Sequence, residues 1–403
     1  MANTALERLR RQERLVALSR VVLLSSRSAN SSQEHLEAKI ATRISKEFSN
    51  PNSEEVEIIE GLKQENLKFV PRVIKQQRDG EFFVKIEENV REKDVHLFHK
   101  FDDKNLDLVE LLVMVDALKI AGVNSVTLYS PYLPYQRQDK KDDGRVPIAA
   151  RLIFDLVATS FGKYLKRIVT FDLHARQARG YLDCPVDELS AIPEFAAYYQ
   201  QLFQSEFERD RSSVFVVSPD AGGAKRARYL AKLLGTQYAV LDKKRTGHGT
   251  AEHTFYLPAD VSYKKVILVD DMVDSGSSVV GESENNLIGP VQYLQSRRAE
   301  IYLCATHSIL SQKGNLSAEQ RLREAHVPCV FTDSVAEKRA GYYIEHADWM
   351  SVVSLDYVLA KAFYCNQVGE SISQFLTGRE KKLLDRKLDI LVHNGTNGVV
   401  DVE

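Results

Sequence analysis

The sequence predicts an α/β protein with two domains, each built around a largely parallel sheet. Three observations support this prediction. The chain has 403 residues, which exceeds the roughly 100–200 residues of one ordinary core. From about residue 18, short β-branched runs alternate with longer stretches of 3.6-residue apolar periodicity, which is the pattern of βαβ units. No apolar run reaches the roughly 18–20 residues that a membrane-spanning helix requires.

Each predicted element rests on this alternation. Eight short apolar segments predict strands, at 20–26, 94–101, 125–133, 167–174, 214–220, 238–243, 265–271 and 300–306. Six stretches of helical periodicity predict helices, at 34–48, 106–122, 146–162, 192–210, 224–235 and 317–325. The helix at 106–122 is apolar on nearly all sides, so we expect the sheet and a second element to cover it.

The stretch 176–191 is rich in turn-forming residues and joins two blocks of alternating strands and helices. It predicts a domain boundary near residue 184. Segment 49–72 is polar and weakly periodic, and predicts a surface excursion. The tail is expected to form an amphipathic helix before a polar end. The predicted parts are an N-terminal extension, two domains and a C-terminal tail, at 1–18, 19–184, 185–376 and 377–403.

Charge and composition exclude several classes of protein. Lys plus Arg number 54 and Asp plus Glu 56, a net charge of −2, so we expect no general attraction to nucleic acid. The N-terminus, MANTALERLRRQERL, has charges where a signal peptide needs an apolar core. We therefore expect a cytoplasmic protein without a membrane anchor. The four cysteines are widely spaced and are expected to be reduced core residues.

The most informative stretch is VILVDDMVDSGSS, residues 266–278, in which an apolar strand leads into two aspartates and a turn of small residues. Acidic residues at the carboxyl end of a parallel strand project into the ligand crevice of such sheets. The turn at 274–278 supplies backbone N–H groups and hydroxyls that suit a phosphate. A sugar phosphate fits both features, whereas the plainer interpretation is an acidic strand end followed by a capped helix.

Three further segments carry candidate ligands. VFVVSPDAGGAKR has the same order of strand, acid and glycines, and makes Asp220 a candidate metal or ribose ligand. RIVTFDLHARQ ends its strand at Asp172 and His174, where the imidazole is either a magnesium or nucleotide contact or a structural residue. The loop PYLPYQRQDKKDDGR gathers cations that would bind a polyphosphate, unless it is only a solvated charged loop: Arg137, Lys140, Lys141 and Arg145.

Together these segments resemble the ribose-phosphate diphosphokinase family, whose members are also called phosphoribosyl pyrophosphate (PRPP) synthetases. The resemblance runs from about residue 19 to about residue 376. PYLPYQRQDKKDDGR is similar to the family's ATP-binding stretch, TFDLHARQ to its metal and ATP segment, VSPDAGGAKR to its pyrophosphate loop and VDDMVDSGSS to its PRPP motif. DKKRTGHGTAEH, residues 242–253, matches the family's catalytic flexible loop in position and length.

The resemblance implies two tandem type I phosphoribosyltransferase-like domains and an enzyme that transfers the diphosphoryl group of ATP to ribose 5-phosphate, giving PRPP and AMP. It implies Mg²⁺ as cofactor and a dimer-based homo-oligomer such as a hexamer. The implied catalytic residues are Lys243 and Arg245. The implied ATP-binding residues are Asp79, Glu81, Arg137, Gln138, Asp139, Lys140, Asp142, Arg145, His174 and Gln177. The implied ribose 5-phosphate residues are Asp220, Asp270, Asp271, Asp274, Ser275, Gly276, Ser277 and Ser278, with His174 and Asp220 also at the metal.

Three positions depart from the family pattern. Gln77 stands where an aromatic residue would stack on adenine, which leaves the nucleotide preference open. Ser277 stands where glycine is usual, so phosphate binding requires that this position has no positive φ. Gly289-Pro290 would interrupt the helix that follows the turn.

Two alternatives to an active synthetase stay open at this stage. A catalytically silent family member that regulates a partner would fit the replacement at Gln77. A type I phosphoribosyltransferase would share the PRPP motif but would not need the ATP-side segments.

Overall fold

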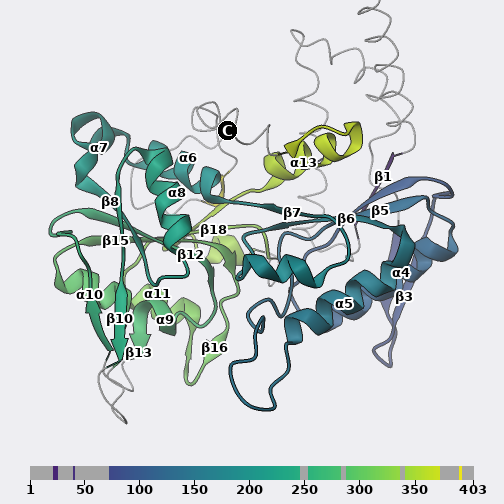
Figure 1. Ribbon diagram of the computed structural model, residues 1–403, viewed down its shortest axis with the longest axis horizontal. Coiled ribbons are helices and arrows are strands. Elements are labelled where there is room, and N and C mark those ends of the chain that lie inside the picture. The colour runs from purple at the N-terminus through teal and green to yellow at the C-terminus, as the bar shows by residue number, and fades with distance from the viewer. Residues whose placement is uncertain are drawn as a thin grey trace, which may run out of the picture. The chain divides into compact units, whose positions relative to one another are not determined.

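The computed structural model describes residues 21–25, 40, 72–245, 253–282, 287–335, 341–372 and 390–392 (Figure 1). The described residues fall into two compact units. The first contains those up to Leu189 together with those from Asp356 to residue 372. The second contains Ser190–Val335, Gly341–Leu355 and residues 390–392. The predicted extension 1–18 and most of the predicted helix 34–48 and excursion 49–72 lie outside the described residues.

The first unit is built on a five-stranded parallel sheet with the order β1-β4-β5-β6-β7. Its strands are β1 Val21–Ser25, β4 Asp94–Phe98, β5 Ser125–Tyr129, β6 Leu165–Phe171 and β7 Val186–Leu189. The central strands are buried on both faces, as expected for a parallel sheet. The first four confirm the strands predicted at 20–26, 94–101, 125–133 and 167–174.

Helix α4 (Leu106–Ile120) is apolar on nearly all sides, and elements other than the central sheet cover part of its surface, as its composition predicts. It packs against α5 (Ala149–Phe161), and the two lie side by side in Figure 1. Its other neighbour is an antiparallel hairpin that the sequence analysis did not identify, formed by β2 (Arg72–Gln76) and β3 (Phe82–Ile86). Short 3₁₀ turns at Gly162–Tyr164 and Arg176–Tyr181 flank β6.

Helix α13 (Asp356–Val368) belongs to the first unit although it follows the second along the chain. The predicted second domain, 185–376, includes this segment, and the structure corrects that assignment. Its Phe363 lies edge-on against the ring of His96 on β4, with the ring centroids 4.6 Å apart. Its Gln367 bonds to His96 Nε2 at 3.0 Å, while His96 Nδ1 lies 2.9 Å from the Tyr129 hydroxyl. The helix therefore completes the core of the first unit.

The second unit has a seven-stranded sheet with the order β20-β19-β18-β15-β12-β8-β9. All neighbours are parallel except β19 and β20, which are antiparallel. Its strands are β8 Val214–Ser218, β9 Gln237–Val240, β12 Lys265–Val273, β15 Glu300–Ser308, β18 Cys329–Thr332, β19 Met350–Val353 and β20 Ile390–Val392. The sequence analysis predicted β8, β9, β12 and β15 and missed the rest.

The helices of the second unit are mostly short. They are α6 Ile192–Leu202, α7 Gln204–Arg209, α8 Ala224–Leu234, α9 Ser277–Val280, α10 Pro290–Ser296, α11 Ala318–Glu324 and α12 Tyr342–Glu345, with a 3₁₀ turn at Arg211–Ser213. The predicted helix 192–210 is divided at Phe203, whose ψ of 28° is not helical. The helix after the turn does not reach Gly289-Pro290, where its interruption was predicted: α9 ends at Val280, and Pro290 is instead the first residue of α10.

Short antiparallel strand pairs outside the main sheet also belong to this unit. They are β10 Asp242–Arg245 with β11 His253–Tyr256, β13 Gly281–Glu282 with β14 Leu287–Ile288, and β16 Gln312–Lys313 with β17 Leu316–Ser317.

The amphipathic helix predicted for the tail is wrong at its described residues, 390–392. This apolar triplet, Ile-Leu-Val, forms strand β20 and pairs with β19, because its β-branched residues suit a sheet edge. The remainder of the tail lies outside the described residues. Across the part of the chain that the structure describes, none of the helices has the length and apolarity needed to span a membrane.

Candidate functional site

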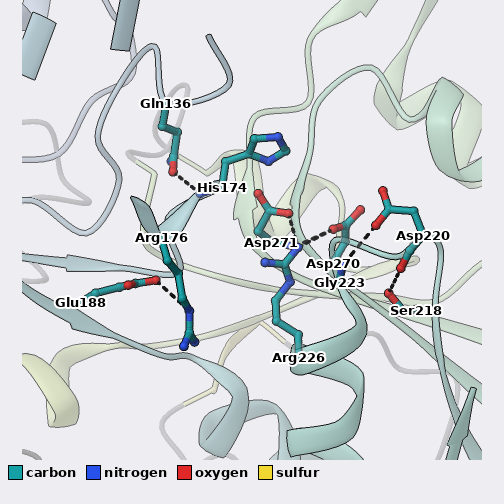
Figure 2. Close-up of polar contacts among 10 residues, drawn as sticks. All are labelled: Gln136, His174, Arg176, Glu188, Ser218, Asp220, Gly223, Arg226, Asp270 and Asp271. Atoms are coloured by element: carbon teal, nitrogen blue, oxygen red, sulfur yellow. Dashed lines mark hydrogen bonds and ion pairs between the residues drawn. The ribbon is translucent and has the colours of Figure 1, made fainter. Parts of the chain in front are cut away.

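Two carboxylates lie near the carboxyl end of β12, as the sequence predicts, and an arginine bonds to both. Arg226 Nη2 on α8 lies 2.7 Å from Asp271 Oδ1 and 3.2 Å from Asp270 Oδ1 (Figure 2). The Asp271 side chain is 3% exposed and that of Asp270 is 18% exposed. Burial and the neighbouring Asp271 charge raise the pKa of Asp270 well above its usual range, while Arg226 opposes this shift.

Residues 274–278 form the turn after β12 and are the phosphate loop that the sequence predicts. Gly276 has a φ of +74°, which a residue with a side chain rarely adopts. Ser277 begins the helical turn of α9 and has no positive φ, so the serine that replaces the usual glycine is accommodated. Among the described hydrogen bonds, none uses the backbone N–H groups of residues 275–278. Four donors are therefore available, beside the paired hydroxyls of Ser275 and Ser277, whose Oγ atoms are 3.0 Å apart.

Two residues beyond the phosphate loop hold it in place. The Ser311 hydroxyl donates to Asp274 Oδ1 at 2.5 Å, and the Ser311 backbone N–H donates to the Asp274 carbonyl at 3.0 Å. The buried Arg321 of α11 donates from Nη1 to the Ser275 carbonyl at 3.0 Å. Ser311 and Arg321 thus bind oxygen atoms of Asp274 and Ser275. These hydrogen bonds fix the loop in the conformation that leaves its N–H groups unpaired.

A second strand end in this unit carries Asp220. Its Oδ1 accepts the N–H of Gly223 at 3.1 Å, and its carbonyl accepts the Ser218 hydroxyl at 2.7 Å (Figure 2). A Cβ at Gly223 would collide with Ser218 Oγ, so glycine is required there for close approach and not for a positive φ. Asp220 is exposed and its Oδ2 takes part in no described hydrogen bond, so one carboxylate oxygen is available to a ligand.

In the first unit, the two segments predicted for ATP lie together after β5 and β6. The buried Gln136 accepts the backbone N–H of His174 with its Oε1 at 2.8 Å (Figure 2). Asp139 is also buried. Its carbonyl accepts the Tyr181 hydroxyl at 2.6 Å, and its carboxylate lies 3.5 Å from Gln177 Nε2. Asp139 thus joins the two segments and presents little surface to a nucleotide.

The other residues predicted for ATP in these segments are exposed: Arg137, Gln138, Lys140, Asp142, Arg145, His174 and Gln177. Lys140 and Asp142 form an exposed ion pair at 3.2 Å. Eight described non-glycine residues have a positive φ, and three of them, Tyr135, Arg145 and Asp172, lie in these segments. Such backbone strain concentrates at functional sites.

Glu188 of β7 was missed by the sequence analysis. Its nearly buried carboxylate lies 3.5 Å from Arg176 Nε (Figure 2). It also lies 3.3 Å from Arg179 Nε. Burial raises its pKa, and the two arginines oppose that shift. The pair of ion pairs fixes the 3₁₀ turn that carries Gln177.

Two hairpins carry the remaining predicted residues. Lys243 and Arg245 lie on β10, where their backbone partners on β11 are Phe255 and His253. Part of the predicted flexible loop, 246–252, lies outside the described residues. Asp79 and Glu81 lie in the exposed turn between β2 and β3, and the Glu81 N–H donates to Asp79 Oδ1 at 3.1 Å.

Two family models match the chain. The one described as the N-terminal domain of ribose phosphate pyrophosphokinase matches residues 27–160, and the phosphoribosyl transferase domain matches residues 185–281. The ribose-phosphate pyrophosphokinase of Fusobacterium nucleatum is 34% identical over 303 residues, which cover 75% of this chain and 88% of the relative. The chain belongs to the ribose-phosphate pyrophosphokinase family.

Other members of the ribose-phosphate pyrophosphokinase family show the same extent of similarity. The enzyme of Caldanaerobacter subterraneus subsp. tengcongensis is 36% identical over 316 residues, covering 77% of this chain and 91% of its own. The crystal structure of phosphoribosylpyrophosphate synthetase from Mycobacterium smegmatis matches with a TM-score of 0.63 and 28% identity, covering 86% of this chain and 98% of that one. Two phosphoribosyltransferase-type domains with mainly parallel sheets are thereby confirmed.

The described residues could hold a magnesium ion only together with the phosphates of a bound substrate. Among them, no group of three or more His, Cys, Asp or Glu side chains is placed to hold a metal ion. Mg²⁺ is usually held by one or two carboxylates together with substrate phosphates and waters. The available Oδ2 of Asp220 suits that mode of binding, whereas the nitrogen ligand of His174 is a less usual partner for this ion.

Three residues that contact the candidate site from distant parts of the chain were not predicted: Arg226, Ser311 and Arg321. Arg226 is the last residue of VSPDAGGAKR, and the sequence pattern alone assigns it no role. Two adjacent buried carboxylates require a nearby cation, and this was the available signal for it. Nothing in the local sequence indicates that Ser311 and Arg321 contact the phosphate loop.

Proposed function

We propose that this ribose-phosphate pyrophosphokinase transfers the β,γ-diphosphoryl group of ATP to the anomeric hydroxyl of ribose 5-phosphate, giving PRPP and AMP. The observation that carries the proposal is the phosphate loop, with four unpaired N–H donors directly after the carboxylates of Asp270 and Asp271. Donors suit the 5-phosphate and carboxylates suit the ribose hydroxyls.

The second unit would bind the sugar phosphate. Asp270 and Asp271 would accept hydrogen bonds from ribose hydroxyls, with Arg226 favouring their charged forms. The loop residues Asp274 to Ser278 would bind the 5-phosphate through backbone N–H groups and hydroxyls. Asp220 would lie beside the anomeric end of the sugar, where its available oxygen would help to hold Mg²⁺. When bound, Mg²⁺ would neutralise charge on the phosphates of ATP.

The first unit would bind ATP. Exposed Arg137, Lys140 and Arg145 would contact the phosphates, because guanidinium and ammonium groups pair well with phosphoryl oxygens. His174 and Gln177 would contact the nucleotide, and the Gln136 side chain would hold the backbone at His174. Asp79 and Glu81 in the β2–β3 turn would contact adenine.

The hairpin of β10 and β11 would carry the catalytic cations, Lys243 and Arg245. Phosphoryl transfer depends on positioning and charge neutralisation more than on covalent chemistry. Two cations on one short strand supply that charge where the diphosphoryl group is transferred. We therefore expect direct transfer without a covalent intermediate on the protein.

We also propose that the protein is a dimer-based homo-oligomer acting in the cytoplasm, with its domain boundary near residue 184. The resemblance at Gln77 to Glu81 supports the first part, because the family's adenine stretch is shared between subunits. Analytical ultracentrifugation of the active protein tests it, and a fully active monomer would contradict it.

The test of the function is an incubation of the purified protein with ATP, Mg²⁺ and ribose 5-phosphate, with AMP and PRPP measured together. We expect equal amounts of both products and none without ribose 5-phosphate. Binding of nucleotide or PRPP without AMP formation would instead support a silent regulatory member. Consumption of PRPP with a nucleobase would support a phosphoribosyltransferase.

A further inference from the structure

The β16–β17 hairpin lies against the phosphate loop and has no role in the reaction described above. It follows β15, which pairs with β12, so the hairpin and the phosphate loop both follow neighbouring strands of one sheet. Its two strands, Gln312–Lys313 and Leu316–Ser317, are antiparallel. The position brings a lysine to the loop that would bind the 5-phosphate.

Arg321 holds the hairpin and the phosphate loop together. Its Nη1 donates to the carbonyls of Leu316 and Ser275, at 3.1 and 3.0 Å, and its Nη2 donates to the carbonyl of Lys313 at 2.5 Å. Because one buried guanidinium binds all three carbonyls, the backbone at Lys313 has a fixed position relative to the loop.

The Lys313 side chain extends to the loop itself. Its Nζ donates to the hydroxyl of Ser277 at 3.3 Å. The backbone N–H of Ser277 is one of the four unpaired donors described above. The Lys313 side chain is exposed to solvent.

We propose that Lys313 binds the 5-phosphate of the sugar substrate and selects a phosphorylated pentose over an unphosphorylated one. This inference rests on the proposed function of the phosphate loop. The N–H and hydroxyl donors of the loop are neutral, whereas a phosphate monoester carries between about one and a half and two negative charges near neutral pH. The ammonium group of Lys313 supplies a positive charge at the hydroxyl that the phosphate oxygens would also contact.

The test compares three variants by calorimetric titration with ribose 5-phosphate in the presence of a non-hydrolysable ATP analogue and Mg²⁺. Lys313→Gln keeps a donor for Ser277 but removes the charge, and we expect its affinity to fall about tenfold. Lys313→Arg keeps the charge and should remain within about threefold of wild type. Lys232→Gln removes an exposed lysine from α8 of the same unit and should bind as wild type does.

Steady-state kinetics supply a second readout. In Lys313→Gln, the KM for ribose 5-phosphate should rise about tenfold, while kcat at saturation changes by less than about twofold, because the contact is made before and during the transfer alike. A structural role of Lys313 in supporting Ser277 would leave the affinity of Lys313→Gln within about twofold of wild type, and that result overturns the proposal.

Failure of the inference and failure of the proposed function give different results. A wild-type protein that binds ribose 5-phosphate but forms no AMP overturns the function alone, and the titrations still decide the role of Lys313. A wild-type protein that binds no ribose 5-phosphate overturns both.

Discussion

At the scale of single residues, Arg226 favours the charged forms of two adjacent carboxylates whose burial favours the neutral form. Asp270 and Asp271 are consecutive on β12 and both are largely removed from water, which raises the cost of ionising them. The guanidinium of Arg226 lowers that cost for both. The sequence alone indicated the carboxylates, because their place at the end of an apolar strand is local. It indicated that a cation must lie nearby but not which one, because Arg226 lies 44 and 45 residues earlier in the chain.

Replacement of this arginine should therefore affect both stability and sugar binding. We expect Arg226→Met to lower the free energy of unfolding by about 3 kcal/mol, since it leaves buried carboxylates without their cation. It should also raise the KM for ribose 5-phosphate at least about tenfold, because a protonated Asp270 accepts fewer hydrogen bonds. Urea unfolding and steady-state kinetics measure the two effects. Arg228→Met, at an exposed position on the same helix, is the control, and equal behaviour of the two variants would refute this role.

At the scale of elements, the sequence predicts correctly those helices and strands whose own residues are enough to determine them. Long apolar strands such as β12 and β15 were predicted because their composition is sufficient. The β2–β3 and β10–β11 hairpins were missed, since strands of four or five residues with mixed polarity give too weak a pattern. The phosphate loop was predicted from its small residues, yet its conformation depends on contacts from a distant hairpin and helix.

The phosphate loop also depends on one backbone conformation, at Gly276. A side chain at a φ of +74° costs about 1–2 kcal/mol, so Gly276→Ala should lower the free energy of unfolding by that amount. Because the loop would relax away from this conformation, binding of ribose 5-phosphate should weaken as well. Urea unfolding and calorimetry test both effects. Gly180→Ala is a suitable stability control, because its Cβ meets nothing within 4 Å; a Gly276→Ala variant as stable as this control would contradict the prediction.

At the scale of the whole molecule, chain order and three-dimensional grouping differ. The sequence placed residues 356–368 in the second domain by continuity, but α13 packs into the first unit. Helix α13 is apolar on most sides, so its sequence shows no clear helical periodicity and does not indicate which unit it packs against. The near-zero net charge was likewise uninformative about ligands, since cations on exposed loops and carboxylates at strand ends cancel in the sum.

The contact between α13 and the first sheet should make stability depend on pH. Burial lowers the pKa of His96 to about 4, below the usual 6.5, so the folded protein holds a neutral imidazole. As the pH falls from 6.5 to 4, the unfolded chain takes up a proton that the folded chain does not. The free energy of unfolding should therefore decrease by up to about 3 kcal/mol over this interval.

Urea unfolding at several pH values measures this dependence. His96→Gln should remove most of the slope between pH 6.5 and pH 4, while replacement of the exposed His326 by Gln should retain it. A slope that is unchanged in His96→Gln would show that other groups cause the dependence.

The central claim is direct diphosphoryl transfer by this chain, and the most direct measurement follows labelled phosphorus from ATP in a single turnover. With ATP labelled at its β phosphorus, the account predicts that the label moves into PRPP as unlabelled AMP forms, only when ribose 5-phosphate is present, and that none stays on the protein. Lys243→Ala should slow this step far more than it weakens ribose 5-phosphate binding. Label retained in ADP, or bound covalently to the protein, would contradict the account.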